Sequence, residues 1–284
     1  MGHGRAAGRS WIVVALLLWG CSGNDALTDP PAEGTGALRS QRMQSVTAAE
    51  GRVAAAEVAG VDMADLVDAL FLGSGPLIPR DGTRVCPLTR VWSGFLRGTT
   101  VRVRVSTTVD AEIRDAIRRA VLQVSSATNG VIRASFELTD DPNPLPGPNE
   151  VTATVHPDPR REGCPSEKGC IQQEFLTRGV LGSGRALEPP GQTPNGYVRD
   201  VVGRGILGMC RIDGRLIGGA GSSLMSAGPG VASGDTAPGL THLDVSATRF
   251  VYASPLSPGA TRTDFLRAGL VNLQVGERQG QPPS

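Results

Sequence analysis

The chain has 284 residues, and its formal net charge at pH 7 is +1, from 28 basic and 27 acidic side chains. This balance leaves no electrostatic case for binding nucleic acid, so we expect no nucleic-acid partner. Hydrophobic residues make up 39% of the chain and aromatic residues only 4%, which predicts a core built mostly from aliphatic side chains. The 38 glycines and 21 prolines predict extensive loops.

The first 21 residues are typical of an export signal. Arg5 and Arg9 precede an apolar run at 11–19, WIVVALLLW, which is too short to span a bilayer. The end of this run and the two residues after it, Leu18-Trp19-Gly20-Cys21, resemble a bacterial lipoprotein box. This implies cleavage before Cys21, acylation of its thiol and anchoring to a membrane at the cell envelope. An ordinary cleaved signal is the alternative.

Two predicted regions separate the signal from the main domain. Residues 22–45 are polar and contain Pro and Gly, which predicts a flexible tether. Residues 46–90 are expected to form a short helical extension, with one alanine-rich helix from Thr47 to Ala59 and a second, amphipathic helix from Asp62 to Leu72. The apolar face of the second helix would hold Met63, Leu66 and Leu70.

A strand, a long helix and a second strand are predicted next. Residues Thr100 to Ser106, TVRVRVS, alternate strictly between polar and apolar, which predicts a half-buried strand. Thr107 or Thr108 is expected to cap the helix. The second strand would run from Val131 to Leu138 after a turn at Asn129-Gly130. The predicted apolar face of the helix holds Ile113, Ile117, Val121 and Val124.

Two more strands precede the central segment of the chain. After a rigid, proline-rich loop at 140–149, Val151 to His156 alternates again, with its valines and Ala153 pointing inward. Residues Cys170 to Leu176 predict an edge strand. The sequence PPGQTPNG at 189–196 predicts a loop.

Four cysteines remain after Cys21, and export to an oxidising compartment favours disulfides. Four cysteines allow three pairings. Cys164 with Cys170 would close a short loop and leave Cys86 for Cys210, but the sequence does not decide between the pairings. A zinc site formed by Cys164, Cys170 and a histidine is the alternative.

The segment from Tyr197 to Gly230, YVRDVVGRGILGMCRIDGRLIGGAGSSLMSAGPG, resembles the active-site segment of the metzincins, the zinc peptidases that include the matrixins. Those enzymes carry H-E-x-x-H-x-x-G-x-x-H on a helix, followed by a turn with a methionine below the metal. Here the Ser-Leu-Met-Ser turn is present, with Met225 as its methionine, but the motif holds no histidine.

Two alignments with the motif fit. The first alignment places Gly208 at the motif's glycine. In this alignment the positions of His, Glu, His and His are taken by Val201, Val202, Gly205 and Arg211. In the second, these positions are taken by Asp200, Val201, Arg204 and Cys210. A third pattern is formed by Arg199, Arg204 and Arg211, whose spacing is one residue longer at each step than that of the motif. These arginines are candidates for substituted histidines, or else solvated surface charges.

The resemblance covers about residues 91–255 and implies an α/β (α+β), zincin-like domain. Its expected parts are a mixed twisted sheet, a long backing helix, a central helix and a Met-turn, with the edge strand antiparallel and lining the substrate cleft. The segment 240–254 resembles the closing helix of a matrixin, and Thr241 and Asp244 predict its capping box. A short helix, TDFLRAGL, and a disordered tail are expected within 256–284.

The missing ligands decide the functional prediction. A catalytic zinc needs about three neutral imidazole or carboxylate ligands and an open position, and arginine is never one of them. His3 lies in the signal, and His156 and His242 lie outside the motif. We therefore expect no bound cofactor and a non-catalytic relative that holds an extended peptide along the edge strand. The alternatives are an active zinc peptidase that uses His156, His242, Asp200 or Cys210, and a structural envelope lipoprotein.

Overall fold

The computed structural model describes residues 61–79, 86, 88, 90–213, 223–227 and 239–273. The predicted export signal, the lipidation site at Cys21, the tether, the helix at 47–59 and the C-terminal tail lie outside these residues. Among the described helices, none is long and apolar enough to cross a membrane.

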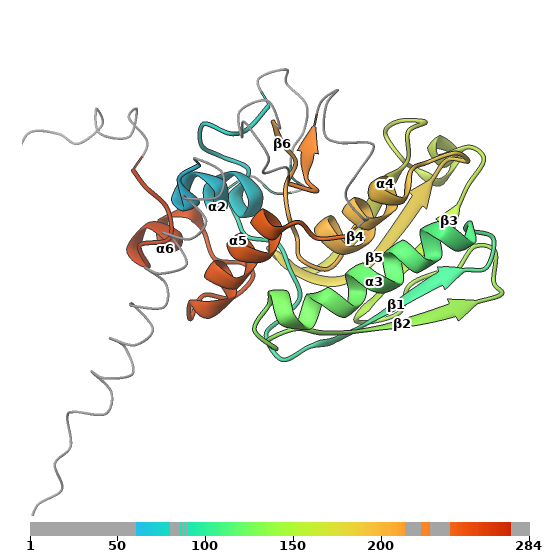
Figure 1. Cartoon of the computed structure of the whole chain (residues 1–284), viewed down its shortest axis with the longest axis horizontal. Coiled ribbons are helices and arrows are strands. Elements are labelled where there is room, and N and C mark those ends of the chain that lie inside the picture. Colours follow the sequence, from blue (N-terminus) through green and yellow to red (C-terminus); the bar gives the residue numbers. More distant parts are fainter. Residues whose placement is uncertain are drawn as a thin grey trace, which may run out of the picture. The chain divides into compact units, whose positions relative to one another are not determined.

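Five strands form a single sheet in the order β2-β1-β3-β5-β4 (Figure 1). The bounds are β1 Thr100–Ser106, β2 Arg133–Thr139, β3 Glu150–Val155, β4 Cys170–Thr177 and β5 Val180–Glu188. Four strands pair in parallel, whereas β4 runs antiparallel to β5 at the edge of the sheet. The predicted mixed sheet and the predicted edge strand are therefore confirmed.

Strand β5 has no counterpart among the predicted elements. Its sequence, VLGSGRALE, lacks the alternation that marks a half-buried strand, and all nine of its residues are buried. Strand β5 lies between β3 and β4 in the sheet, and side chains on both of its faces are buried. A strand that is buried on both faces gives no period of two in the sequence.

Strand β3 is also buried on both faces. Val151 and Ala153 face the core as predicted, but Thr152 and Thr154 on the opposite face are only 0% and 1% exposed. The loop at 140–149 reaches this second face, because Thr154 Oγ1 donates to the carbonyl oxygen of Pro142 at 2.5 Å. The short 3-10 helix η1, Pro159–Glu162, reaches it through a salt bridge of 3.2 Å between Glu162 and Arg185.

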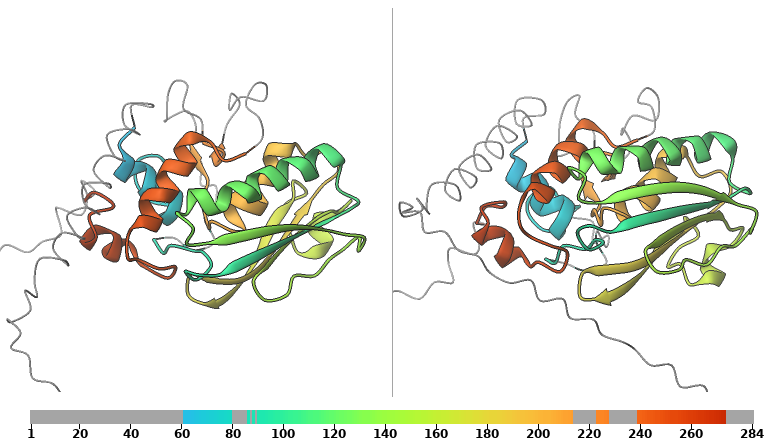
Figure 2. Two further views of the ribbon diagram at one scale, coloured as in Figure 1. Left: turned by 60° about the horizontal axis from the view of Figure 1, so that its bottom comes forward. Right: turned by 90° about the horizontal axis from the view of Figure 1, so that it is seen from below.

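The long helix α3, Ala111–Ala127, lies along the first face of the sheet (Figure 2). Its predicted apolar face is confirmed, since Ile113, Ile117, Val121 and Val124 are all buried. The predicted cap is wrong: the N-cap is Asp110 rather than Thr107 or Thr108. Those threonines form a turn after β1, in which Thr107 N–H donates to Thr139 and Val109 N–H to Ser106.

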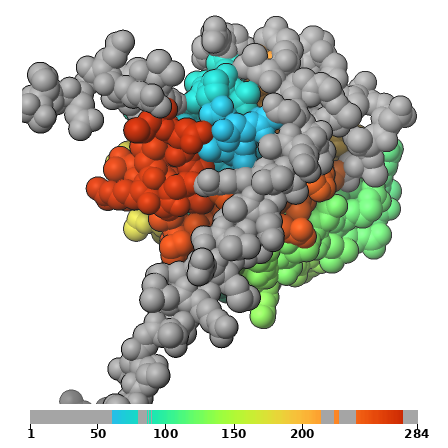
Figure 3. Space-filling model, turned by 60° about the vertical axis from the view of Figure 1, so that its left-hand side comes forward, coloured from blue at the N-terminus to red at the C-terminus, as the bar shows by residue number. Residues whose placement is uncertain are grey.

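Three further helices pack around the buried indole of Trp92. They are α2 Met63–Leu72, α5 His242–Ala253 and α6 Arg262–Arg267. Trp92 makes edge-on contacts with Phe71, Tyr252 and Phe265, with ring centroids 6.3, 5.1 and 6.0 Å apart. One aromatic residue from each helix therefore meets the same indole, and Figure 3 shows α2 against the C-terminal helices on the surface.

Helix α2 is buried almost all round rather than amphipathic, which corrects the prediction. Even Asp68 is buried, and it forms a salt bridge of 2.9 Å with Arg262 of α6. Leu70 contributes its carbonyl oxygen to the N–H of Cys210. Such contacts on every side explain why this helix has no exposed polar face.

The predicted capping box of α5 is confirmed, with Thr241 and Asp244 bonding each other's backbone N–H. Helix α6 also begins with a capping box, and it starts one residue earlier than predicted. Thr261 and Asp264 form its capping box, so the helix begins at Arg262 and ends at Arg267. The prediction TDFLRAGL therefore found the helix but misplaced both of its ends.

Candidate functional site

The segment that resembles the peptidase motif begins as a short α-helix and continues as a π-helix. Helix α4, Pro194–Val198, has Thr193 as its N-cap, so Pro194 to Gly196 form a first helical turn rather than the end of the predicted loop. The π-helix η2, Arg199–Arg204, follows directly. The predicted central helix is thus present, but half of it has a wider turn than an α-helix.

The wider turn of the π-helix determines which side chains of this segment lie close together. In η2 the N–H of Gly205 donates to the carbonyl oxygen of Asp200 at 2.9 Å, five residues back. A π-helix therefore accommodates one residue more per turn than an α-helix. Arg199 and Arg204 are five positions apart, one more than the spacing that aligns side chains on an α-helix. In the wider turn both side chains reach the same carboxylate.

That carboxylate belongs to Asp200, which is only 3% exposed. Arg204 Nη1 lies 3.2 Å from Asp200 Oδ1, and Arg199 Nε lies 3.6 Å from the same oxygen. The side chain of Arg199 is 29% exposed and that of Arg204 is 23% exposed. They are thus half-buried members of a charge cluster, which argues against the alternative that they are solvated surface charges.

A second carboxyl group joins the cluster from the end of β5. Glu188 is fully buried, and its Oε2 accepts a hydrogen bond from Gln192 Nε2 at 2.9 Å. Burial, together with the neighbouring Asp200, raises the pKa of Glu188 to about 9, so this group is protonated at neutral pH. Its Oε1 receives no hydrogen bond from the described residues.

Tyr197 of α4 borders the same cluster. Its side chain is 1% exposed, and its hydroxyl has no hydrogen-bond partner among the described residues. Burial raises the pKa of Tyr197, and the nearby carboxyl of Glu188 raises it further. The phenol therefore stays neutral and keeps an unused donor near the carboxyl group of Glu188.

The other motif positions point into the core or bind elsewhere. Val201, Val202 and Gly205, which the first alignment places at ligand positions, are buried among apolar groups. Cys210 forms a disulfide with Cys86. Arg211 is half-buried. The structure thus brings together the first and third residues of the second alignment, Asp200 and Arg204, and no larger part of either ligand set.

Gly208 has the backbone expected of the glycine where the motif's helix ends. Its φ is +66°, which is the left-handed region that favours glycine. A Cβ at this position would overlap the carbonyl oxygen of Ser93. Two independent constraints therefore demand glycine here.

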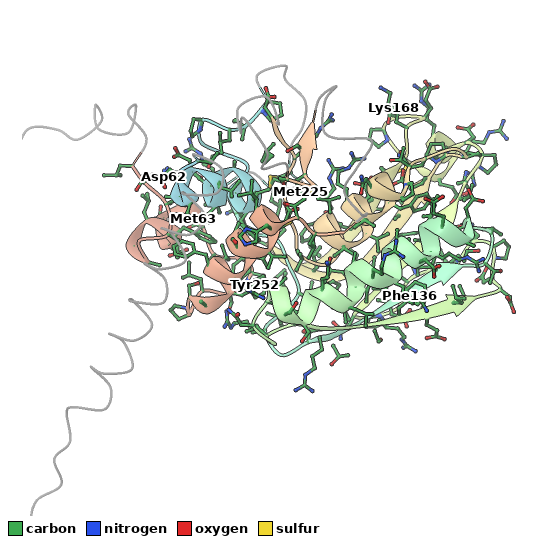
Figure 4. The ribbon with its side chains drawn as sticks, in the orientation of Figure 1. Asp62, Met63, Phe136, Lys168, Met225 and Tyr252 are labelled. Atoms are coloured by element: carbon green, nitrogen blue, oxygen red, sulfur yellow. A yellow bond between two sulfur atoms is a disulfide. The ribbon has the colours of Figure 1, made fainter. Side chains whose placement is uncertain are left out.

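The methionine turn packs against the central segment. Residues 224 and 225 form a turn, and Met225 (Figure 4) is fully buried. A Cβ added to Gly203 of η2 would lie 2.5 Å from Met225 Sδ, so the glycine makes room for the sulfur. Short strands β6, Ile212–Asp213, and β7, Ser226–Ala227, pair in parallel and tie the turn to the chain that follows η2.

Asp244 of α5 holds this turn from the other side. Its Oδ1 accepts from Ser223 Oγ at 2.5 Å, and its Oδ2 accepts from Leu224 N–H at 2.9 Å. Burial raises the pKa of Asp244, against the opposing effect of these hydrogen bonds and those from Thr241. The closing helix and the methionine turn are thus joined by one buried carboxyl group.

The remaining predicted ligands lie away from Asp200 or are already bonded. Cys164 and Cys170 form a disulfide, which replaces the alternative of a zinc site. His156 Nδ1 accepts from Asp158 N–H at 3.2 Å, and its Nε2 lies 3.5 Å from Glu162. His242 is exposed at the start of α5. Within the described ranges, no three His, Cys, Asp or Glu side chains are grouped so that they could hold a metal ion.

Strand β4 passes directly beside the charge cluster. Gln173, in the middle of β4, donates from Nε2 to the carbonyl oxygen of Arg204 at 2.9 Å. The opposite edge of β4 pairs with no other strand in the described part of the chain. At its end, Leu176 is 64% exposed. An unpaired edge of this kind leaves every second N–H and C=O group available to another extended segment.

Sequence reasoning missed Glu188, Tyr197 and Gln173. The position of Glu188 depends on β5, which has no sequence signature, and Gln173 lies on a strand whose contacts with η2 are long-range. The sequence held one signal for Glu188: it is an acidic residue that follows the apolar pair Ala186-Leu187 and precedes Pro189-Pro190. Searches of known protein families and of curated proteins gave no match to this chain.

Proposed function

We propose that this chain is a non-catalytic relative of the metzincin peptidases and that it holds an extended peptide along the unpaired edge of β4. The observation that carries the proposal is the ion pair between Asp200 and Arg204. In the second alignment, these residues occupy the positions of the first two histidines. Opposite charges at these positions neutralise each other and need no metal ion.

Several features support the kinship. The edge strand β4 is antiparallel, as in the family it resembles, and α3 backs the sheet. Gly208, the motif's glycine in the first alignment but not in the second, has the left-handed backbone that favours glycine. Met225 packs against that helix, and Asp244 holds its turn.

The residues present do not fit a catalytic zinc. Arg199 and Arg204 bring positive charge to the carboxylate of Asp200. Cys210, which the second alignment places at the third histidine, has its sulfur in a disulfide. A zinc ion here would meet two cations and fewer than the three ligands it requires. We therefore derive no hydrolytic step for this site.

Peptide binding by strand addition follows from the edge of β4. In this mode the main-chain hydrogen bonds supply affinity, and side-chain pockets supply specificity. The neighbouring groups that a peptide would meet are Gln173, Leu176 and the two arginines of η2.

We further propose that the chain is exported and held at the bacterial envelope by acylation of Cys21. The two disulfides, Cys86–Cys210 and Cys164–Cys170, suit an oxidising compartment. Metabolic labelling with a palmitate analogue, compared between the parent and Cys21→Ser, tests the anchor: label retained by the variant would refute it.

Metal analysis tests the loss of catalysis. The purified protein is dialysed against zinc, washed, and assayed for zinc by mass spectrometry and for casein hydrolysis. We expect well under one zinc per chain and no hydrolysis. One tightly bound zinc per chain together with hydrolysis would end the proposal and favour an active peptidase.

Backbone methylation of the ligand tests strand addition. Peptides that bind in a screen of extended eight-residue sequences, the length of β4, are resynthesised with N-methyl groups at odd or at even positions. We expect one set to lose binding and the other to keep it, because alternate N–H groups face the strand. Equal binding by both sets would rule out addition to β4, and binding by no peptide would favour a purely structural lipoprotein.

A further inference from the structure

The cluster on η2 has more hydrogen-bond donors than acceptors. Arg199 and Arg204 each carry a guanidinium group with five N–H donors. In the described part of the chain, both guanidinium groups lie within salt-bridge distance of one carboxylate, that of Asp200, and the Nε of Arg199 makes no hydrogen bond. The buried hydroxyl of Tyr197, which lies near Glu188, makes no hydrogen bond there either.

The same residues leave positive charge uncompensated. Two guanidinium groups face one ionised carboxylate, because the second carboxyl, Glu188, is neutral at pH 7. A single additional carboxylate would balance the cluster. A phosphate dianion suits it less well, since its two negative charges exceed the one positive charge that Asp200 leaves uncompensated. Bidentate pairing with a carboxylate is also the geometry that arginine favours.

The π-helix η2, which carries the two arginines, lies against β4. Their side chains remain about a quarter exposed, in contrast to the buried acidic groups beneath them. Gln173, which bonds the backbone of Arg204, lies in the middle of the strand. A peptide paired along β4 would therefore extend past Arg204 in both directions and would present a side chain there rather than its end.

We infer that the peptide held on β4 carries an acidic side chain, Asp or Glu, that binds Arg199 and Arg204. This inference rests on the proposed peptide-binding function and specifies the class of ligand. The acidic side chain takes up the unused donors of the two arginines, and its charge completes the balance with Asp200.

The test compares blocked peptides that differ at one central residue. The probes are threonine-rich, eight-residue peptides with acetylated and amidated ends and with Glu, Gln or Lys at the centre, and a fourth peptide has Gln and a free C-terminal carboxylate. Dissociation constants are measured by fluorescence polarisation with the parent, Arg199→Gln, Arg204→Gln and Arg119→Gln. Arg119 is exposed on α3 and serves as the matched control.

We expect the Glu peptide to bind about tenfold more tightly than the Gln peptide, and the Lys peptide to bind most weakly. Arg199→Gln and Arg204→Gln should abolish most of this preference, whereas Arg119→Gln should preserve it. Arg204→Gln removes the nearest partner of a buried carboxylate and could therefore prevent folding. If it does, the affinities measured with Arg199→Gln decide the test.

Each other outcome has a distinct meaning. Equal affinity for the Glu, Gln and Lys peptides overturns the inference but leaves peptide binding intact. Tight binding of the Gln peptide only when its C-terminus is free also overturns it, because the ligand is then a chain end. Binding of none of the peptides defeats both the inference and the proposed function.

Discussion

Asp244 and Ser223 are joined by a buried hydrogen bond of 2.5 Å between Oδ1 and Oγ. The other oxygen of Asp244 accepts from Leu224 N–H and closes the capping box of α5 through Thr241. A single carboxyl group thereby fixes both the start of the closing helix and the turn that places Met225 against η2. The stability of the site therefore depends on a residue outside it.

Replacing Asp244 with Asn should lower the free energy of unfolding by about 2–4 kcal/mol, because an amide nitrogen then faces N–H and O–H donors in a buried position. Urea unfolding followed by circular dichroism measures the loss. Asp264→Asn is the matched control, since Asp264 forms the same capping box in α6 without holding a second turn. It should cost much less, and equal losses in the two variants would contradict the bridging role of Asp244.

Replacing Glu188 with Gln should change how stability depends on pH. The pKa of Glu188 is about 9 in the folded chain, against an ordinary value of 4.5. Between these values the unfolded chain loses a proton that the folded chain keeps, so this group makes the free energy of unfolding fall as pH rises, by up to about 1.4 kcal/mol per pH unit. Below pH 4.5 it has no such effect.

Since Gln carries no proton to lose, Glu188→Gln should gain stability relative to the parent as pH rises from 5 to 8. Urea unfolding at several pH values in this interval gives the difference. Glu137→Gln, on the exposed side of β2, is the control and should follow the parent. A parent-to-variant difference that stays constant across the interval would show that Glu188 is ionised in the folded chain.

Two glycines with similar backbones should respond very differently to alanine. Gly130 has φ +74° with no atom within 4 Å of an added Cβ, whereas Gly208 has φ +66° and a Cβ there would overlap the Ser93 carbonyl. Gly130→Ala should cost about 1–2 kcal/mol from backbone strain alone. Gly208→Ala should cost more than about 4 kcal/mol or prevent folding. Soluble yield and thermal unfolding compare them, and similar values would mean that the contact with Ser93 relaxes freely.

The two disulfides should differ in their contribution to stability. Cys86 and Cys210 are 124 residues apart, and Cys164 and Cys170 only 6 apart. Loop-closure entropy predicts a stabilisation of about 5 kcal/mol for the long bridge and about 2.4 kcal/mol for the short one. Double Cys→Ser variants of each pair, unfolded in urea, measure both values. A larger loss from the short pair would contradict this ranking.

Much of the fold was predictable because the signals are local. The alternation of TVRVRVS defined β1 to the residue, and the spacing of four apolar residues identified α3. Thr241 and Asp244 predicted the capping box of α5, which needs only residues three apart. By contrast, β5 escaped prediction because a strand covered on both faces has no alternation to detect.

The site was predictable only in outline. The sequence pointed to the segment around Asp200 and Arg204 and to the turn at Met225, but it left two alignments open. The π-helix and the ion pair at 3.2 Å show which of these side chains meet. Glu188, 12 positions earlier in the chain, entered the cluster only through the pairing of β5 with β3.

By itself, the sequence determined the local elements of this protein and the absence of histidine from the motif. The tertiary structure decided which cysteines pair, which strand lies at the centre of the sheet and which charges face one another. The physical reason is the range of the interactions. Periodicity and capping act within one or two turns of chain, whereas burial, the pKa of Glu188 and the balance of charge around Asp200 depend on segments that only folding brings together.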